Sequence, residues 1–132
     1  MKRLALTKDD SATIGFVLDC FASCAIDLHE LQAWADHVLL STDSYPPYII
    51  ELSTYDDSPC KVDRVVGFVP DSLLTPRQED AVLGIALSRG RDPDPGVTDR
   101  VKAFAALRAE PTVLAEFRET FPFIELPNDR NA

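Results

Sequence analysis

The stretch CFASCAIDLHELQAWADH, residues 20–37, gathers the residue types that bind metals and transfer protons. Cys20 and Cys24 are four residues apart, and His29 and His37 follow them. Two cysteines at this spacing on one helix share a face and could hold one ion. A structural zinc site needs four ligands, in two close pairs, but the two histidines are separated by about 12 Å along a helix axis. We therefore expect no metal site, and we expect the cysteines to pack in the core as small apolar residues.

The two histidines are also the candidates for acid–base catalysis, because the pKa of imidazole suits neutral pH. They share the polar side of a predicted helix with Gln32 and Asp36, so a solvated helix face is the favoured interpretation. A small enzyme that uses His29 or His37 remains an alternative. The sequence contains no nucleophile signature of a known hydrolase type and no glycine-rich phosphate loop. We predict that the chain is not an enzyme and has no cofactor.

The segment RDPDPGVTDR, residues 91–100, has the acidic start of a calcium-binding loop. Asp92 and Asp94 match the first and third positions of an EF-hand, but Gly96 arrives one position early. Position 12, where a glutamate should bind the ion, is Ala103. We expect a turn-rich surface loop without a metal.

Prolines mark where helices begin. Thr75, Pro76 and Gln78 supply a hydroxyl cap, a first-turn proline and the partner residue of a capping box, which predicts a helix that stops at Gly90. Shorter versions of the pattern predict helices that begin near Pro47, Pro59 and Pro111.

Apolar spacing and caps predict three further helices. One carries Ile14 and ends near Ala25, and a second begins after Asp27, with Glu30 at the capping-box position. A third is capped by Thr98, and its expected apolar stripe is Val101, Phe104, Ala105 and Leu107. Residues 65–69, VVGFV, could form a strand, but one strand has no partner, so an extended segment is preferred. The expected fold is all-α: a compact single-domain bundle of about six or seven short helices over residues 1–132, with a flexible tail at 127–132.

The composition bounds the possible partners. The chain has 22 acidic residues against 13 lysines and arginines, a formal charge of −9. This field repels phosphate backbones and anionic lipids, so nucleic acid and membrane surfaces are poor partners, and a basic protein is a better one. The N-terminus lacks a signal-peptide core, and three cysteines form no disulfide framework, so we expect a cytoplasmic protein.

Acidic residues and tyrosines occur together in the middle of the chain. The simple interpretation is a solvated edge; the functional one is a recognition surface, because tyrosine buries area at low entropic cost. The residues expected to contact a partner are Asp36, Glu51, Asp56 and Asp57, with Tyr48 and Tyr55 as anchors.

Three stretches carry a resemblance to a family. They are IGFVLDCFASCAIDLHELQAWADHVL, GFVP at 67–70 and AVLGIALSRG at 81–90. In composition and order they resemble small acidic immunity proteins of bacterial polymorphic-toxin and contact-dependent growth inhibition systems. The resemblance implies a non-enzymatic protein that binds and neutralises a cognate toxin domain, often a basic nuclease. The alternative is a cytoplasmic regulatory or adaptor protein that binds another helical protein. No oligomeric state is predicted.

Overall fold

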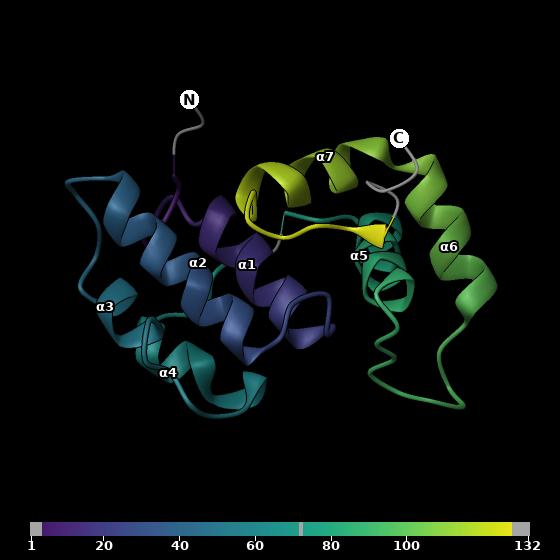
Figure 1. The fold of residues 1–132 in the computed structure, drawn as a ribbon, viewed down its shortest axis with the longest axis horizontal. Helices are drawn as coiled ribbons and strands as arrows, with labels where there is room; N and C mark the ends of the chain where they lie inside the picture. The colour runs from purple at the N-terminus through teal and green to yellow at the C-terminus, as the bar shows by residue number, and fades with distance from the viewer. Residues whose placement is uncertain (1–3, 72, 128–132) are drawn as a thin grey trace. The chain divides into compact units, whose positions relative to one another are not determined.

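The computed structural model describes residues 4–71 and 73–127, and the regular elements of this part are helices. Along the chain they are α1 (Ala12–Ala22), α2 (Leu28–Ser41), α3 (Tyr48–Leu52), the 3₁₀ turn η1 (Pro59–Lys61), α4 (Val62–Val66), α5 (Pro76–Ser88), α6 (Arg100–Ala109) and α7 (Pro111–Thr120) (Figure 1). In the described part no helix is long and apolar enough to cross a membrane.

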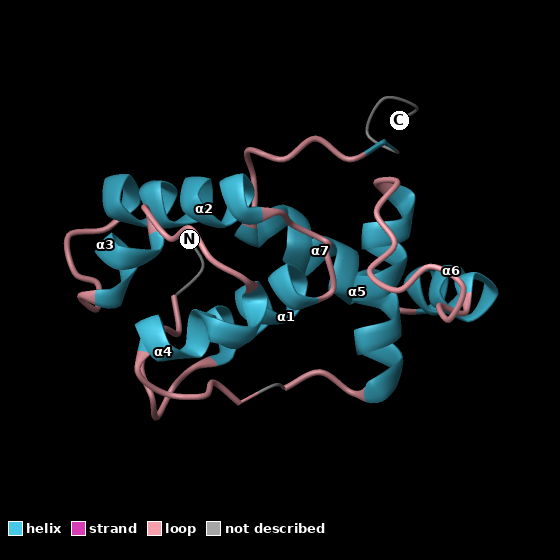
Figure 2. Ribbon diagram, turned by 90° about the horizontal axis from the view of Figure 1, so that it is seen from below, coloured by secondary structure: helices cyan, strands magenta, loops and turns pink. Residues whose placement is uncertain are grey.

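The all-α class predicted from the sequence is confirmed. Extended pairing within the described residues is limited to one isolated bridge between Thr7 and Asp10, and Figure 2 shows helices joined by loops. Residues 65–69 form no strand: α4 ends at Val66, Gly67 caps it in the left-handed conformation at φ 91°, and Phe68 lies in a bend. Of the tail predicted to be flexible, residues 128–132 lie outside the described residues.

The contacts divide the chain into two compact units. Unit 1 is Met1–Ala22 with Ile26–Leu73, and unit 2 is Ser23–Ala25 with Leu74–Ala132. A single domain over residues 1–132 stays a prediction.

Large side chains fill the core of unit 1. Trp34 on α2 is 1 % exposed. Around the same core, the ring of Tyr55 meets Phe21 edge to face, with centroids 6.4 Å apart, and Tyr48 meets Phe68 at 6.1 Å. Such aromatic pairs add stability beyond the area that they bury.

The entry to α2 follows the sequence prediction. Asp27 accepts a hydrogen bond from the Glu30 amide at 2.8 Å, and the Glu30 carboxylate accepts one from the Asp27 amide at 2.9 Å. This capping box is confirmed, and it fixes the start of the helix because it satisfies two backbone donors that lack intrahelical partners.

The end of α1 differs from the prediction. The helix stops at Ala22, before Ala25, and Cys24 adopts a left-handed conformation at φ 68°. Cys20 and Cys24 therefore do not share a helix, and the expected i, i+4 arrangement of their sulfurs is wrong. Left-handed backbone breaks the helical register, so sequence spacing no longer sets which face Cys24 occupies.

Unit 2 is built on a close contact between α5 and α6. A Cβ atom at Gly84 would lie 2.7 Å from the carbonyl oxygen of Ala103, so the two helices approach with almost no side chain between them. The capping box predicted at Thr75 and Gln78 begins α5 and is confirmed. In the same unit, the rings of Phe117 and Phe121 pack with their centroids 4.9 Å apart.

Helix α6 differs from the prediction in its N-terminal cap and in the residues that it buries. Asp99 caps the helix by accepting from the Lys102 amide, whereas the Thr98 hydroxyl donates to Asp92. The buried residues are Ala103 and Ala106. Of the expected stripe, Val101 and Ala105 are exposed and Phe104 and Leu107 are half-buried. The close approach of α5 at Gly84 accounts for the burial of Ala103, whose carbonyl oxygen would lie 2.7 Å from a Cβ atom there.

Candidate functional site

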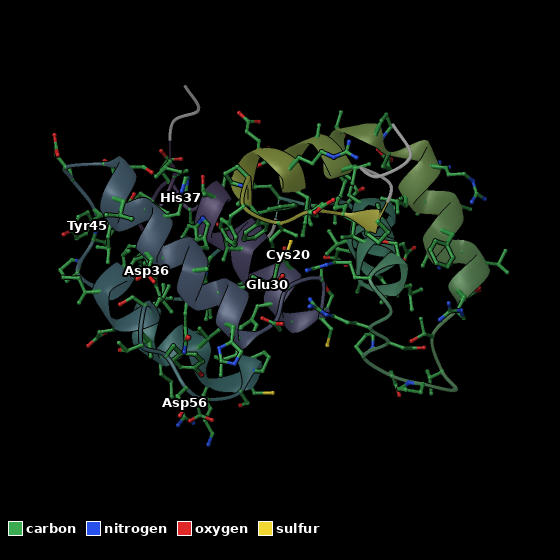
Figure 3. All side chains as sticks on the ribbon, in the orientation of Figure 1. Cys20, Glu30, Asp36, His37, Tyr45 and Asp56 are labelled. Carbon is green, nitrogen blue, oxygen red and sulfur yellow. The ribbon has the colours of Figure 1, made fainter. Side chains whose placement is uncertain are left out.

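The four acids predicted to bind a partner are exposed on unit 1. Asp36 lies on α2, Glu51 on α3, and Asp56 and Asp57 in the loop that leads to η1. Figure 3 places Asp36 and Asp56 well apart, with Asp56 beyond α4. The predicted acids are therefore distributed over the surface of unit 1 and do not form one tight cluster.

Local partners distinguish Asp57 from the other three acids. Its carboxylate accepts a hydrogen bond from the Ser58 amide at 2.7 Å and lies 3.8 Å from the ammonium group of Lys61. Within the described residues no basic side chain forms such a pair with Asp36, Glu51 or Asp56. Of the four acids, Asp57 is the one with an ion-pair partner in the described part of the chain.

The structure contradicts the expectation that Tyr48 and Tyr55 lie on the surface as anchors for a partner. They are 6 % and 7 % exposed. The Tyr48 hydroxyl donates to the Leu6 carbonyl, and the Tyr55 hydroxyl donates to the Ser58 carbonyl at 2.6 Å. Burial raises the pKa of both phenols, and nearby acids, Asp57 first, raise that of Tyr55 further. Both rings stabilise the fold and are unsuited to anchor a partner.

The residues suspected of metal or acid–base chemistry are dispersed. Cys20 is fully buried, Cys24 is half-buried and Cys60 is exposed, while His29 and His37 are exposed on α2. No group of three or more His, Cys, Asp or Glu side chains with the arrangement of a metal site occurs in the part of the chain that the structure describes. The packing of Cys20 matches its expected core position.

The two units differ strongly in charge, and this feature was missed in the sequence. Unit 1 contains 12 acidic and five basic residues, a formal charge of −7, whereas unit 2 contains ten and eight, a charge of −2. The signal was available, because residues 9–60 hold ten acids and no lysine or arginine. Counting acidic and basic residues separately along the sequence would have revealed this local excess of negative charge.

Apolar side chains accompany the acids between residues 36 and 51. Leu40, near the end of α2, is 89 % exposed, and Ile50 on α3 is 54 % exposed. Tyr45, in the connecting loop, is half-exposed. We call residues 36–51 the α2–α3 segment; its two helices lie side by side in Figure 2. Leu40 falls outside the buried positions Leu31, Ala35 and Val38, so helical spacing could have marked it as exposed.

Comparison with known proteins finds no match: no family model, no curated protein and no solved structure is similar to this chain.

Proposed function

We propose that this chain is an immunity protein, a non-enzymatic binding protein that neutralises a basic toxin domain through the acidic surface of unit 1. The observation that carries the proposal is the charge of −7 on unit 1, with Asp36, Glu51 and Asp56 exposed and without ion-pair partners in the described part of the chain. The resemblance to small acidic immunity proteins implies that the partner is a toxin domain.

The physical reason is long-range attraction. Electrostatic potentials of opposite sign on two proteins raise their rate of association well above that of neutral partners. They also favour one relative orientation of the two proteins. Rapid capture matters for an inhibitor, because a toxin acts until it is bound.

The cysteines support a reducing compartment. The chain has three cysteines, an odd number without the spacing of a disulfide framework, which fits a reducing environment. We therefore place the proposed inhibitor in the cytoplasm, where a toxin that has entered the cell would act.

The test is protection in cells. The protein encoded beside the gene for this chain is expressed from an inducible promoter, alone and together with this chain. The proposal predicts that the neighbouring protein stops growth and that co-expression restores it. Combined Asp36→Asn, Glu51→Gln and Asp56→Asn substitutions should lower the affinity for that protein about tenfold or more at low salt, since each change removes one attractive charge.

The matched control changes three acids of unit 2, Asp94→Asn, Glu110→Gln and Glu119→Gln, which removes the same charge from the other unit. Equal loss of affinity in both triple variants would contradict the assignment to unit 1. A neighbouring protein that is harmless, or whose toxicity this chain does not relieve, would contradict the immunity role.

A second candidate, an adaptor that binds another helical protein, is favoured by the exposed Leu40 and Ile50. Apolar contacts are far less sensitive to salt than charge pairs. The adaptor role therefore predicts an affinity that changes little between low and physiological salt, and the immunity role predicts a steep fall.

A further inference from the structure

The α2–α3 segment combines exposed apolar side chains with unbalanced acids. Leu40 projects almost fully into solvent. Asp36 precedes it by four residues on α2, and residues at this spacing share one helix face. On the short helix α3, exposed Ile50 is followed directly by exposed Glu51. The segment contains no lysine or arginine.

The end of α2 adds to the negative potential beside Leu40. The last carbonyls of a helix carry a partial negative charge of about half a unit. Basic side chains in the last turn normally offset this charge, but α2 has none there. Exposed Asp43 follows two residues after the helix and adds a full negative charge. Leu40 is thus an apolar side chain in a locally anionic environment.

This combination specifies the chemistry of the occupant. Apolar side chains at the centre with polar and charged side chains around them are the usual arrangement of a protein interface. A second copy of the chain would bring acids against acids, which is unfavourable. A cation alone would leave Leu40 exposed. A helix with leucine-type residues on one face and lysines or arginines beside them satisfies both features.

We propose that the α2–α3 segment docks a basic amphipathic helix, with Leu40 and Ile50 against its apolar face and Asp36, Asp43 and Glu51 against its cations. This inference rests on the proposed function, because it names the element of the basic partner that unit 1 would bind. Asp57 is then peripheral, since its carboxylate is already engaged by Lys61 and the Ser58 amide.

The test uses two synthetic peptides of about 14 residues with equal lysine content. In the first, leucines occupy positions i, i+3, i+4 and i+7, so the helix is amphipathic. In the second, glutamine replaces each leucine, which preserves helix propensity and charge. Binding of both is measured by calorimetry at low salt, for the natural chain, for Leu40→Ser and for a matched control, Val101→Ser. Val101 is 80 % exposed on α6 of unit 2.

The inference predicts that the natural chain binds the leucine peptide at least about tenfold more tightly than the glutamine peptide, because one face of the helix is buried. Leu40→Ser should remove that preference, and Val101→Ser should keep it. Equal affinity for the two peptides, or a preference that survives Leu40→Ser, would overturn the inference. The cell-protection assay is read separately, so an inhibitor without this preference would fail only the docking inference, and a docking protein without protection would fail only the immunity role.

Discussion

The two units of this protein handle charge in different ways. In unit 2, with a formal charge of −2, acids lie close to cations: Arg100 is 3.9 Å from Asp92, and Lys102 is 3.7 Å from Asp80. In unit 1, with a charge of −7, the cations are few and the acids of the α2–α3 segment lack such pairs within the described residues. Exposed pairs contribute little stability, so the difference in charge has little effect on folding. In the proposed function, the negative field of unit 1 attracts the partner.

The two units use the same two kinds of packing. Trp34 in unit 1 and Phe117 in unit 2 are fully buried. A Cβ atom at Gly15 in unit 1 would lie 2.6 Å from the Asp71 carbonyl oxygen, and one at Gly84 in unit 2 would lie 2.7 Å from that of Ala103. A core of large side chains is weakened by removing volume, and a close backbone contact is weakened by adding it. Removing volume at Trp34 and adding volume at Gly84 should therefore both be damaging.

The largest effect is expected from Trp34→Ala in unit 1. Emptying this fully buried site should lower the free energy of unfolding by about 3–5 kcal/mol. Urea unfolding followed by far-ultraviolet circular dichroism measures it without the lost fluorescence of the single tryptophan. The control, Leu40→Ala on the same helix, should change stability by less than about 0.5 kcal/mol, because an exposed side chain contributes little packing. Similar losses of stability in the two variants would contradict the assignment of Trp34 to the core and of Leu40 to the surface.

In unit 2, Gly84→Ala should be destabilising by about 1–3 kcal/mol, since the added methyl group meets the Ala103 carbonyl oxygen and forces α5 and α6 apart. Thermal unfolding is the measurement, with exposed Glu79→Ala in the same helix as the control. A gain of about 1 kcal/mol, the usual benefit of alanine over glycine in a helix, would show that the close contact is absent.

Alkaline pH should act on unit 1 through its buried phenols. The folded pKa of Tyr48 lies above its ordinary value, because burial disfavours the anion. Its stabilising contribution is therefore complete below about pH 10 and is lost as the pH rises toward the folded pKa. Tyr48→Phe should cost about 1 kcal/mol at neutral pH, through the lost hydrogen bond to Leu6, and should flatten the alkaline decline. Urea unfolding at pH 7 and above pH 10, beside Tyr45→Phe, separates the two effects. An unchanged slope would refute the role of burial.

Acidic pH should act on unit 2 through Asp92, with the smallest effect. The Thr98 hydroxyl and the Asp94 amide donate to its carboxylate and hold its pKa below the ordinary value, with help from Arg100. The stability from these contacts is present above about pH 4 and is lost as the pH falls through the folded pKa. Asp92→Asn should decline less steeply under acid than the natural chain, and so should Thr98→Val. A steeper decline in either variant would contradict this origin.

The sequence predicted helices where the determinants are local. The capping boxes at Asp27 and Thr75 and the prolines before α3, η1 and α7 depend on residues only a few positions apart, and all of these starts are confirmed. Predictions failed at the end of α1 and at the buried face of α6. A left-handed residue, Cys24, follows the early end of α1, and no sequence pattern had indicated it. On α6, Ala103 lies against Gly84 of α5, a contact between residues far apart in the sequence.

In the candidate site too, some features could be predicted from the sequence and others could not. Exposure of the four acids could be expected from their charge alone, because ionised side chains are rarely buried. Tyrosine gives no such indication, since its ring and its hydroxyl favour different environments. Only the hydrogen bonds to the carbonyls of Leu6 and Ser58 reveal that Tyr48 and Tyr55 belong to the core.

The central claim, that unit 1 binds a basic partner through the α2–α3 segment, is tested most directly by nuclear magnetic resonance. The isotope-labelled chain is titrated with the leucine–lysine peptide at low salt, and amide shifts are followed in both units. The account predicts shifts concentrated in residues 36–51, which diminish as salt screens the charges, with the amides of α5, α6 and α7 little affected. Shifts concentrated in unit 2, or shifts that salt does not reduce, would contradict it.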